Sequence, residues 1–83
     1  MYNIIVSAQA KKELKRISKS YQEPLIIAFE EIRENPLAGK PLTRELTGKF
    51  SYKVGMFRII YRVNGKDKIV QVITAGHRAT VYK

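Results

Sequence analysis

The chain has 83 residues, no cysteine and a formal net charge of +9, which suits one domain with a single core over residues 1–83. The absence of cysteine excludes a disulfide framework and a thiolate metal site, and no apolar run approaches the roughly 18 residues of a membrane span, so we expect a soluble, cytoplasmic protein without a membrane partner. Residues 36–83 hold ten basic residues against two acidic ones, and this asymmetry indicates a polyanionic partner such as nucleic acid.

The first half of the chain predicts a strand and two helices. Residues 2–6 form a short apolar run, and Ser7 is a suitable N-cap for a helix that begins directly after it. In this helix the apolar residues share one face and the basic residues the opposite face, which either contacts RNA phosphates or is only solvated. Pro24 suits the first turn of a second helix, which Asn35–Pro36 ends. The short connection over residues 20–23 makes the two helices an antiparallel hairpin.

The second half predicts an irregular loop over residues 36–49 and then a sheet. The strand that begins at Phe57 alternates, so that Phe57, Ile59, Tyr61 and Val63 share the face under the helices. The other face carries Arg58, Ile60 and Arg62 and stays open to solvent, where Ile60 needs cover from another segment or a partner. Asn64-Gly65 predicts a type I′ turn before a β-branched run over residues 69–74. The order predicts an α+β fold, in which an N-terminal strand and an antiparallel helical hairpin pack on a mostly antiparallel sheet of about four strands.

Most familiar sets of catalytic residues are absent. A single histidine excludes a histidine cluster for zinc, the phosphate-binding glycine motifs are missing, and the acidic residues lie mainly on the helices, so we expect neither metal nor cofactor. The remaining candidates are cations and tyrosines, namely Lys53, Arg58, Arg62, His77, Arg78 and Tyr82. Such a set suits RNA scission through the ribose 2′-OH. Arginine stabilises the negative charge that grows on the phosphate, and a lysine crowded by cations can act as a base.

Residues 48–63, GKFSYKVGMFRIIYRV, are followed by ITAGHR at residues 73–78 and by Val81-Tyr82. This pattern resembles the RelE/ParE superfamily of toxins from type II toxin–antitoxin systems, and the resemblance covers almost the whole chain. It implies a RelE-like fold and a metal-independent endoribonuclease that cuts mRNA in the ribosomal A site. It also implies a RelB-like antitoxin, which we expect to be acidic and to cover an apolar groove of the toxin with a helix.

Carried over by position, the resemblance implies a role for individual residues. Lys53 matches a strand lysine that takes part in proton transfer, Arg58 and Arg78 match the arginines that hold the scissile phosphate, and Tyr82 matches a tyrosine that stacks on the substrate. Gly55 departs from the pattern, because the best-known members carry a second lysine there. This leaves the general base open, and His77 can share the acid–base work. We expect further substrate contacts from Arg44, Lys49 and Arg62.

Two other functions fit the same residues. A ParE-like toxin on this scaffold inhibits gyrase by binding, and the combined presence of Lys53, Arg58, Arg78 and Tyr82 disfavours it. A non-catalytic nucleic-acid-binding module needs only the charge, with each cation facing solvent. The module predicts steep salt dependence and mild effects of any single arginine change, whereas the enzyme predicts a steep loss of rate.

Overall fold

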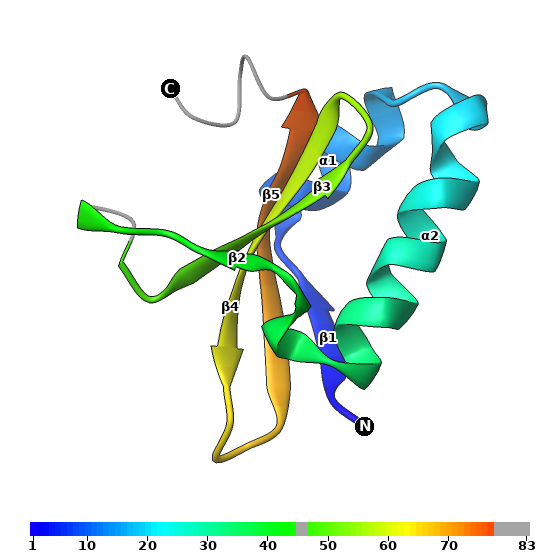
Figure 1. Ribbon diagram of the computed structural model, residues 1–83. Helices are drawn as coiled ribbons and strands as arrows, with labels where there is room; N and C mark the ends of the chain where they lie inside the picture. The colour runs from blue at the N-terminus through cyan, green and yellow to red at the C-terminus, as the bar shows by residue number, and fades with distance from the viewer. Residues whose placement is uncertain (45–46, 78–83) are drawn as a thin grey trace.

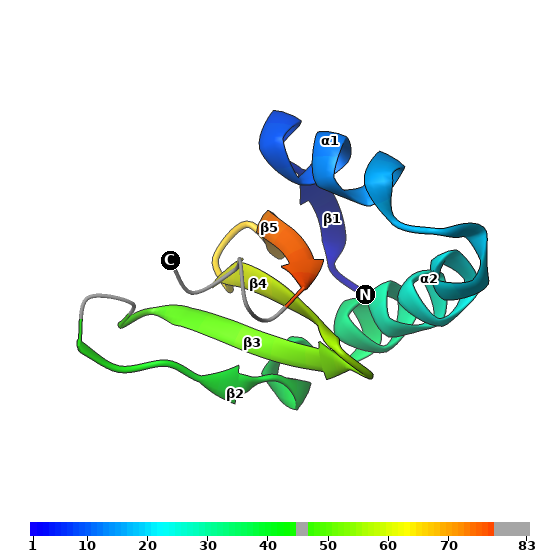
Figure 2. The same ribbon diagram turned by 90° about the horizontal axis from the view of Figure 1, so that it is seen from above.

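The computed structural model describes residues 1–44 and 47–77. Its elements are β1 (Asn3–Val6), α1 (Ala8–Arg16), α2 (Lys19–Glu34), the 3-10 helix η1 (Pro36–Ala38), β2 (Lys40–Pro41), β3 (Lys49–Val54), β4 (Phe57–Asn64) and β5 (Ile69–His77). The strands form one sheet in the order β1-β5-β4-β3-β2, in which β1 is parallel to β5 and the other neighbours are antiparallel. The helices pack on this sheet, α1 against β5 and α2 against β1 and β3 (Figures 1 and 2). The predicted α+β fold is confirmed.

The two helices meet earlier in the chain than predicted. Ser7 caps α1 as expected, since its Oγ accepts a hydrogen bond from the backbone N–H of Ala10 at 3.0 Å. The connection is only residues 17–18, because Ser18 has extended backbone angles (φ −61°, ψ 153°) and α2 begins at Lys19. The placement of Pro24 in the first turn is therefore wrong. Pro24 lies one turn further in, where it removes one N–H from the helical ladder. Among the described residues, neither helix combines the length and the apolar character needed to cross a bilayer.

The segment after α2 is more regular than the loop predicted for residues 36–49. The Asn35 side chain accepts a hydrogen bond from the Leu37 N–H at 3.3 Å, and this cap starts η1. The two residues of β2 then pair with β3, Lys40 opposite Ser51, which raises the sheet to five strands where about four were expected. A two-residue strand has no pattern that a sequence can show, because its pairing depends on β3 lying beside it.

The connection between β4 and β5 also differs from the prediction. The turn spans residues 65–68 and is not a type I′ turn at Asn64-Gly65, since the positive φ in this segment belongs to Lys68 (φ 54°). The Asn64 side chain closes the loop instead, because its Oδ1 accepts from the Asp67 N–H at 3.1 Å and its Nδ2 donates to an Asp67 carboxylate oxygen at 3.0 Å. Asparagine makes such side-chain turns as readily as type I′ turns.

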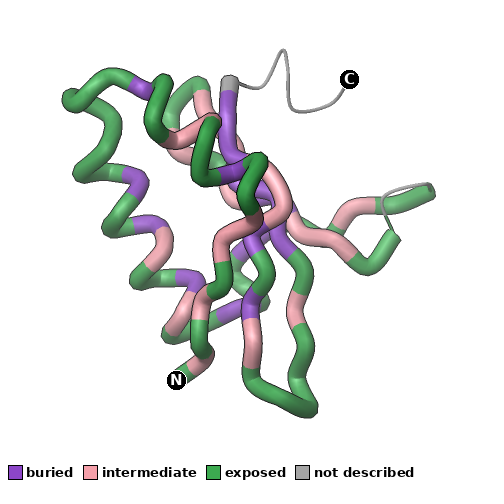
Figure 3. Tube along the Cα trace, turned by 180° about the vertical axis from the view of Figure 1, so that it is seen from behind, coloured by how far each residue is buried: buried purple, intermediate pink, exposed green. Residues whose placement is uncertain are grey.

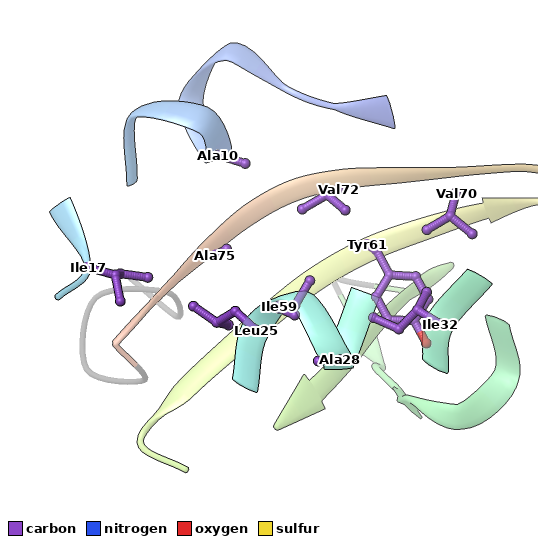
Figure 4. Close-up of a cluster of buried hydrophobic side chains, with 10 residues drawn as sticks. All are labelled: Ala10, Ile17, Leu25, Ala28, Ile32, Ile59, Tyr61, Val70, Val72 and Ala75. Atoms are coloured by element: carbon purple, nitrogen blue, oxygen red, sulfur yellow. The ribbon is translucent and has the colours of Figure 1, made fainter. Parts of the chain in front are cut away.

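The hydrophobic core lies between the helices and one face of the sheet. In β4 the buried residues of this face are Ile59 and Tyr61, as predicted, and Phe57 and Val63 pack against the cluster at its margin. Along α2 the buried positions recur on the side toward the sheet (Figure 3). The fully assembled cluster comprises Ala10, Ile17, Leu25, Ala28, Ile32, Ile59, Tyr61, Val70, Val72 and Ala75 (Figure 4).

Candidate nucleic-acid interface

The cations of the sheet gather on the face that points away from the helices. Because Ile59 and Tyr61 point toward the helices, strand alternation turns Arg58, Ile60 and Arg62 to the opposite face. Ile60 is only 4% exposed there, and it does not belong to the core cluster under the helices. The predicted division of β4 into an apolar face and an arginine face is therefore confirmed, and so is the expectation that Ile60 is covered.

Strand pairing places two lysines of β3 directly opposite the two arginines of β4. Lys53 pairs with Arg58, and Lys49 pairs with Arg62. Directly opposed residues of an antiparallel pair have their Cβ atoms about 4.5–5.5 Å apart on the same face. Four positive side chains thus lie in two cross-strand rows, and we call this set the cationic sheet face (Lys49, Lys53, Arg58 and Arg62).

Like charges in directly opposed positions destabilise a sheet. Between the residues that the structure describes, the ion pair formed is that of Arg33 with Glu30 on α2, at 3.2 Å, so no described carboxylate offsets Lys49, Lys53 or Arg62 in this way. A surface that concentrates positive charge against the preference of its own strands is more typical of a binding site than of a solvated face.

Arg58 is more enclosed than its neighbours across the sheet. Its side chain is half-buried and its Nε atom is shielded from solvent, whereas Lys53 and Arg62 are exposed. Packing around the inner part of a guanidinium restricts its rotamers and so fixes the direction in which the charged end points. Arg58 is therefore the cation of this face best suited to hold an anion in a defined geometry.

The end of β5 lies next to the Lys53–Arg58 row. Gly76 pairs with Arg58 and His77 pairs with Phe57, so the backbone of His77 comes one residue beyond this row. Arg78 and Tyr82 lie outside the described residues. Arg44 follows β2 in the chain and is not one of the paired positions of β3 and β4. Its backbone has φ 59° and its carbonyl accepts from the Thr47 hydroxyl at 2.6 Å, and no described contact joins it to the cationic sheet face.

Gly55, where the sequence departs from the RelE pattern, has a structural role. It is the first residue of the two-residue turn between β3 and β4, and its φ is +59°. A two-residue hairpin with positive φ at its first position alone is the type II′ turn, which favours glycine there. A lysine at this position would adopt a left-handed backbone conformation at a cost of about 1–2 kcal/mol.

Sequence reasoning did not find the residues that hold the end of β5 in place. Beyond β1, the free edge of β5 is covered by α1. The Ser7 hydroxyl donates to the Ile73 carbonyl at 2.8 Å, and the Glu13 carboxylate accepts from the Thr74 hydroxyl at 2.6 and 2.8 Å and from the Ala75 N–H at 3.2 Å. One sequence feature could have indicated this role: Glu13 is the single acidic residue within the basic helix α1.

A bulge in β5 brings these contacts into register. Tyr61 pairs with Val72 while Ile60 pairs with Thr74, so Ile73 is an extra residue opposite β4. Bulges re-aim side chains and are frequent beside functional sites. Here the bulge returns Ala75 to the core after Val72 and sets Gly76 opposite Arg58.

Comparison with known proteins identifies the scaffold. The sequence profile described as "ParE toxin of type II toxin-antitoxin system, parDE" matches residues 4–82. Toxin RelG of Mycobacterium tuberculosis is 31% identical over 84 residues, which cover 99% of this chain and 97% of that protein. Toxin RelE of the same organism is 26% identical, covering 99% of this chain and 87% of the relative.

Two solved structures show the same fold. The toxin–antitoxin complex RelBE2 from Mycobacterium tuberculosis matches with a TM-score of 0.85 and 30% identity, over 93% of this chain and 98% of that one. The isolated E. coli RelE toxin matches with a TM-score of 0.81 and 24% identity, over 99% of this chain and 92% of that one. The chain therefore belongs to the RelE/ParE family of toxins from type II toxin–antitoxin systems.

Proposed function

We infer that this toxin is a metal-independent endoribonuclease that cleaves mRNA on the ribosome through the ribose 2′-OH. The observation that carries this function is the pairing of Lys53 with half-buried Arg58 on the face of the sheet away from the helices, one residue from the His77 backbone. Among the described residues, no three histidine, cysteine, aspartate or glutamate side chains come together in a way that suits a metal ion. We assign the chemistry to the cations of the chain, because strand pairing brings Lys53 and Arg58 together.

In the proposed reaction the substrate supplies the nucleophile. A base removes the proton of the 2′-OH, the 2′-oxygen attacks the adjacent phosphorus, and the bond from phosphorus to the 5′-oxygen breaks. The products are a 2′,3′-cyclic phosphate and a 5′-hydroxyl, whose proton comes from a general acid. The intermediate carries more negative charge than the substrate, so a fixed guanidinium stabilises it more than the ground state.

The residues divide the work according to their placement. Arg58 donates to the non-bridging oxygens of the scissile phosphate, and Lys53 takes part in proton transfer beside it. Lys49 and Arg62, in the second row of the cationic sheet face, bind a neighbouring phosphate and hold the strand in register. For Arg78 and Tyr82 the roles rest on the resemblance to RelE toxins, which also supplies the ribosomal A site as the place of cleavage.

The test is cleavage of mRNA on programmed ribosomes by purified variants. Replacing Arg58 with alanine removes a donor aimed at the reacting phosphate, and we expect a loss of about 10²–10³ in rate. Arg58→Lys keeps the charge but not the two-pronged donor geometry, so its rate should fall between those of wild type and Arg58→Ala. Lys66→Ala, in the exposed β4–β5 turn, removes the same charge away from the sheet face and should cut at the wild-type rate.

Three results would contradict this function. The first is intact A-site codons after incubation with wild-type toxin and programmed ribosomes. The second is equal, mild loss of activity in Arg58→Ala and Lys66→Ala, which would indicate a general charge effect and a non-catalytic binding module. The third is inhibition of gyrase in a supercoiling assay without any mRNA cleavage, which would assign the ParE-like binding function.

The proposal includes a RelB-like antitoxin as the partner that silences the toxin. Neighbouring structures were solved as complexes of this kind, among them RelBE2 and the intact E. coli RelBE complex. A groove of about 260 Å³ lies between α1 and α2, and its lining is mainly apolar with one cation: Leu14, Lys15, Gln22, Leu25, Ile26 and Phe29. An acidic amphipathic helix fits this groove, because its apolar side chains enter the groove while a carboxylate at its margin faces Lys15.

A matched pair of substitutions tests whether the antitoxin binds in this groove. Ile26 and Ile27 are similarly exposed, at 60% and 55%, but only Ile26 lines the groove between the helices. We expect Ile26→Glu to weaken binding of the antitoxin strongly and Ile27→Glu to weaken it little, as measured by titration calorimetry. Equal effects of the two substitutions would place the antitoxin elsewhere.

A further inference from the structure

We propose that the outer face of α1 is a second phosphate-binding surface, which docks the toxin on the backbone of folded RNA. This surface is separate from the cationic sheet face, to which the proposed function assigns the mRNA. It extends the proposed function by adding a second contact to RNA, and it does not depend on cleavage.

The surface consists of four exposed cations on one side of a nine-residue helix, namely Lys11, Lys12, Lys15 and Arg16. At about 100° per residue they fall within an arc of roughly 140°, opposite the inward side chains of Ala10 and Leu14. They form two rows, Lys11 with Lys15 and Lys12 with Arg16, in which the charges are about 6 Å apart along the helix axis.

The helix carries this charge at a cost to its own stability. Like charges four residues apart destabilise a helix, and both rows are of this kind. The helix dipole compensates Lys15 and Arg16 in the last turn, but it gives no such support to Lys11 and Lys12. None of the four forms an ion pair with any residue in the described part of the chain.

The one carboxylate of α1 is turned away from these cations. Glu13 is half-buried and accepts hydrogen bonds from Thr74 and Ala75 of β5, so it is engaged with the sheet. An ordinary solvated helix of this composition would place glutamate beside lysine at i,i+4 spacing. In α1 the acid supports the fold and the outer face stays uniformly positive.

The composition of this face favours nucleic acid over protein as its partner. The exposed large hydrophobic residues of the described chain are Met1, Ile5, Tyr21, Ile26, Ile27, Leu37 and Met56, and none of them belongs to α1. Protein interfaces need apolar or aromatic anchors at their centre and are depleted in lysine. A phosphate backbone needs only positive charge at a suitable spacing, and neutralising it releases counterions.

The placement of α1 makes this contact independent of the sheet. The helix packs against β5 from the core side, with Ala10 in the core cluster. Its outer face therefore points away from the sheet, whereas the cationic sheet face lies on the other side of the sheet. When one RNA segment is bound on the sheet, α1 therefore stays available to a second segment. A large folded RNA can supply both segments.

The experiment measures how binding of a short RNA duplex of arbitrary sequence depends on salt, using fluorescence anisotropy. The test variant is Lys11→Gln/Lys12→Gln, because neither residue lines the groove between α1 and α2 or lies in the last turn of α1. The control is Lys66→Gln/Lys68→Gln, which removes the same charge from the exposed β4–β5 turn. Thermal unfolding checks that both variants are folded.

If α1 contacts the duplex, the magnitude of the log–log salt slope should fall by about 1–2 in the α1 variant, since each lost phosphate contact contributes about 0.9 on a B-form duplex. The control should keep the wild-type slope. Equal slopes in all three proteins would overturn the proposal, and so would a selective loss of binding to polyglutamate in the α1 variant with RNA binding unchanged, which would indicate an acidic protein partner. Because a duplex is bound and not cut, failure of the cleavage proposal leaves this result interpretable.

Discussion

Tyr61 lies in the core, and its hydroxyl contacts both ends of η1. Removing this hydroxyl is the sharpest test of the packing. The hydroxyl donates to the Pro36 carbonyl at 2.7 Å and accepts from the Gly39 N–H at 2.9 Å. Its ring stacks on Phe50, with centroids 5.5 Å apart and an interplanar angle of 16°. Substitution of Tyr61 by phenylalanine keeps the ring and removes only this bridge between β4 and the ends of η1.

The expected cost follows from the groups that lose their partner. Pro36 and Gly39 are buried, so the carbonyl and the N–H stay dry after the substitution. A buried polar group left unsatisfied costs about 1–3 kcal/mol, and we expect the two together to lower the free energy of unfolding by about 2–4 kcal/mol. A domain of this length has a total stability of about 4–12 kcal/mol, so this is a large part of the total. At about 4–8 °C per kcal/mol, the midpoint of thermal unfolding should fall by about 8–30 °C.

Urea unfolding followed by circular dichroism measures this difference, with Tyr52→Phe as the matched control. The Tyr52 hydroxyl donates to the Glu31 carboxylate at an exposed position, where water replaces the lost partner. The control should cost less than about 1 kcal/mol. If the two substitutions destabilise the protein equally, the buried bridge contributes nothing and the reasoning fails.

Three further predictions follow from the same structure. Burial raises the pKa of Tyr61, and the Gly39 hydrogen bond opposes this shift. The neutral hydroxyl therefore contributes fully to stability below about pH 10, and this contribution is lost as the pH rises above that value. The stability difference between wild type and Tyr61→Phe should shrink on alkaline titration, and a constant difference would contradict this. Glu13→Ala leaves the Thr74 hydroxyl and the Ala75 N–H without their acceptor and should lower the free energy of unfolding by about 2–3 kcal/mol. Glu23→Ala, an exposed control on α2, should change it little. Glu13→Ala should also shift the NMR signal of the chain's single histidine, which follows Ala75 and Gly76, and an unchanged signal would show that Glu13 does not position this segment. Gly55→Lys should destabilise the toxin by about 1–2 kcal/mol because of its positive φ, with Met56→Lys in the same turn as the unstrained control, and equal unfolding midpoints of these two variants would refute the turn assignment.

The elements with strong periodicity were predictable from the sequence. The N-cap Ser7, the amphipathic pattern of α1 and the alternation of β4 each depend on local spacing, and the structure confirms all three. The start of α2 was misplaced because local preference favours proline in the first turn, and the packing of α2 overrides that preference. The turn after Asn64 was misplaced because asparagine closes a longer loop as well as it forms a tight turn.

The content of the candidate site was visible in the sequence, but its arrangement was not. Arg58 and Arg62 were placed on one face by alternation alone, and the motif that contains them indicated the toxin family. Which lysine lies opposite which arginine depends on the register of β3 with β4, and a shift by one residue would move every side chain to the other face. No local pattern encodes that register.

By itself, the sequence determined the charge of this protein, the faces of its helices and strands, and the residue types available for chemistry, because these depend on composition and on short-range periodicity. Only the tertiary structure decided that Lys53 opposes Arg58, that Glu13 binds the end of β5 and does not pair with the cations of α1, and that a turn requires Gly55. Each of these contacts joins residues through strand pairing or side-chain packing, and their energies appear only once the chain is folded.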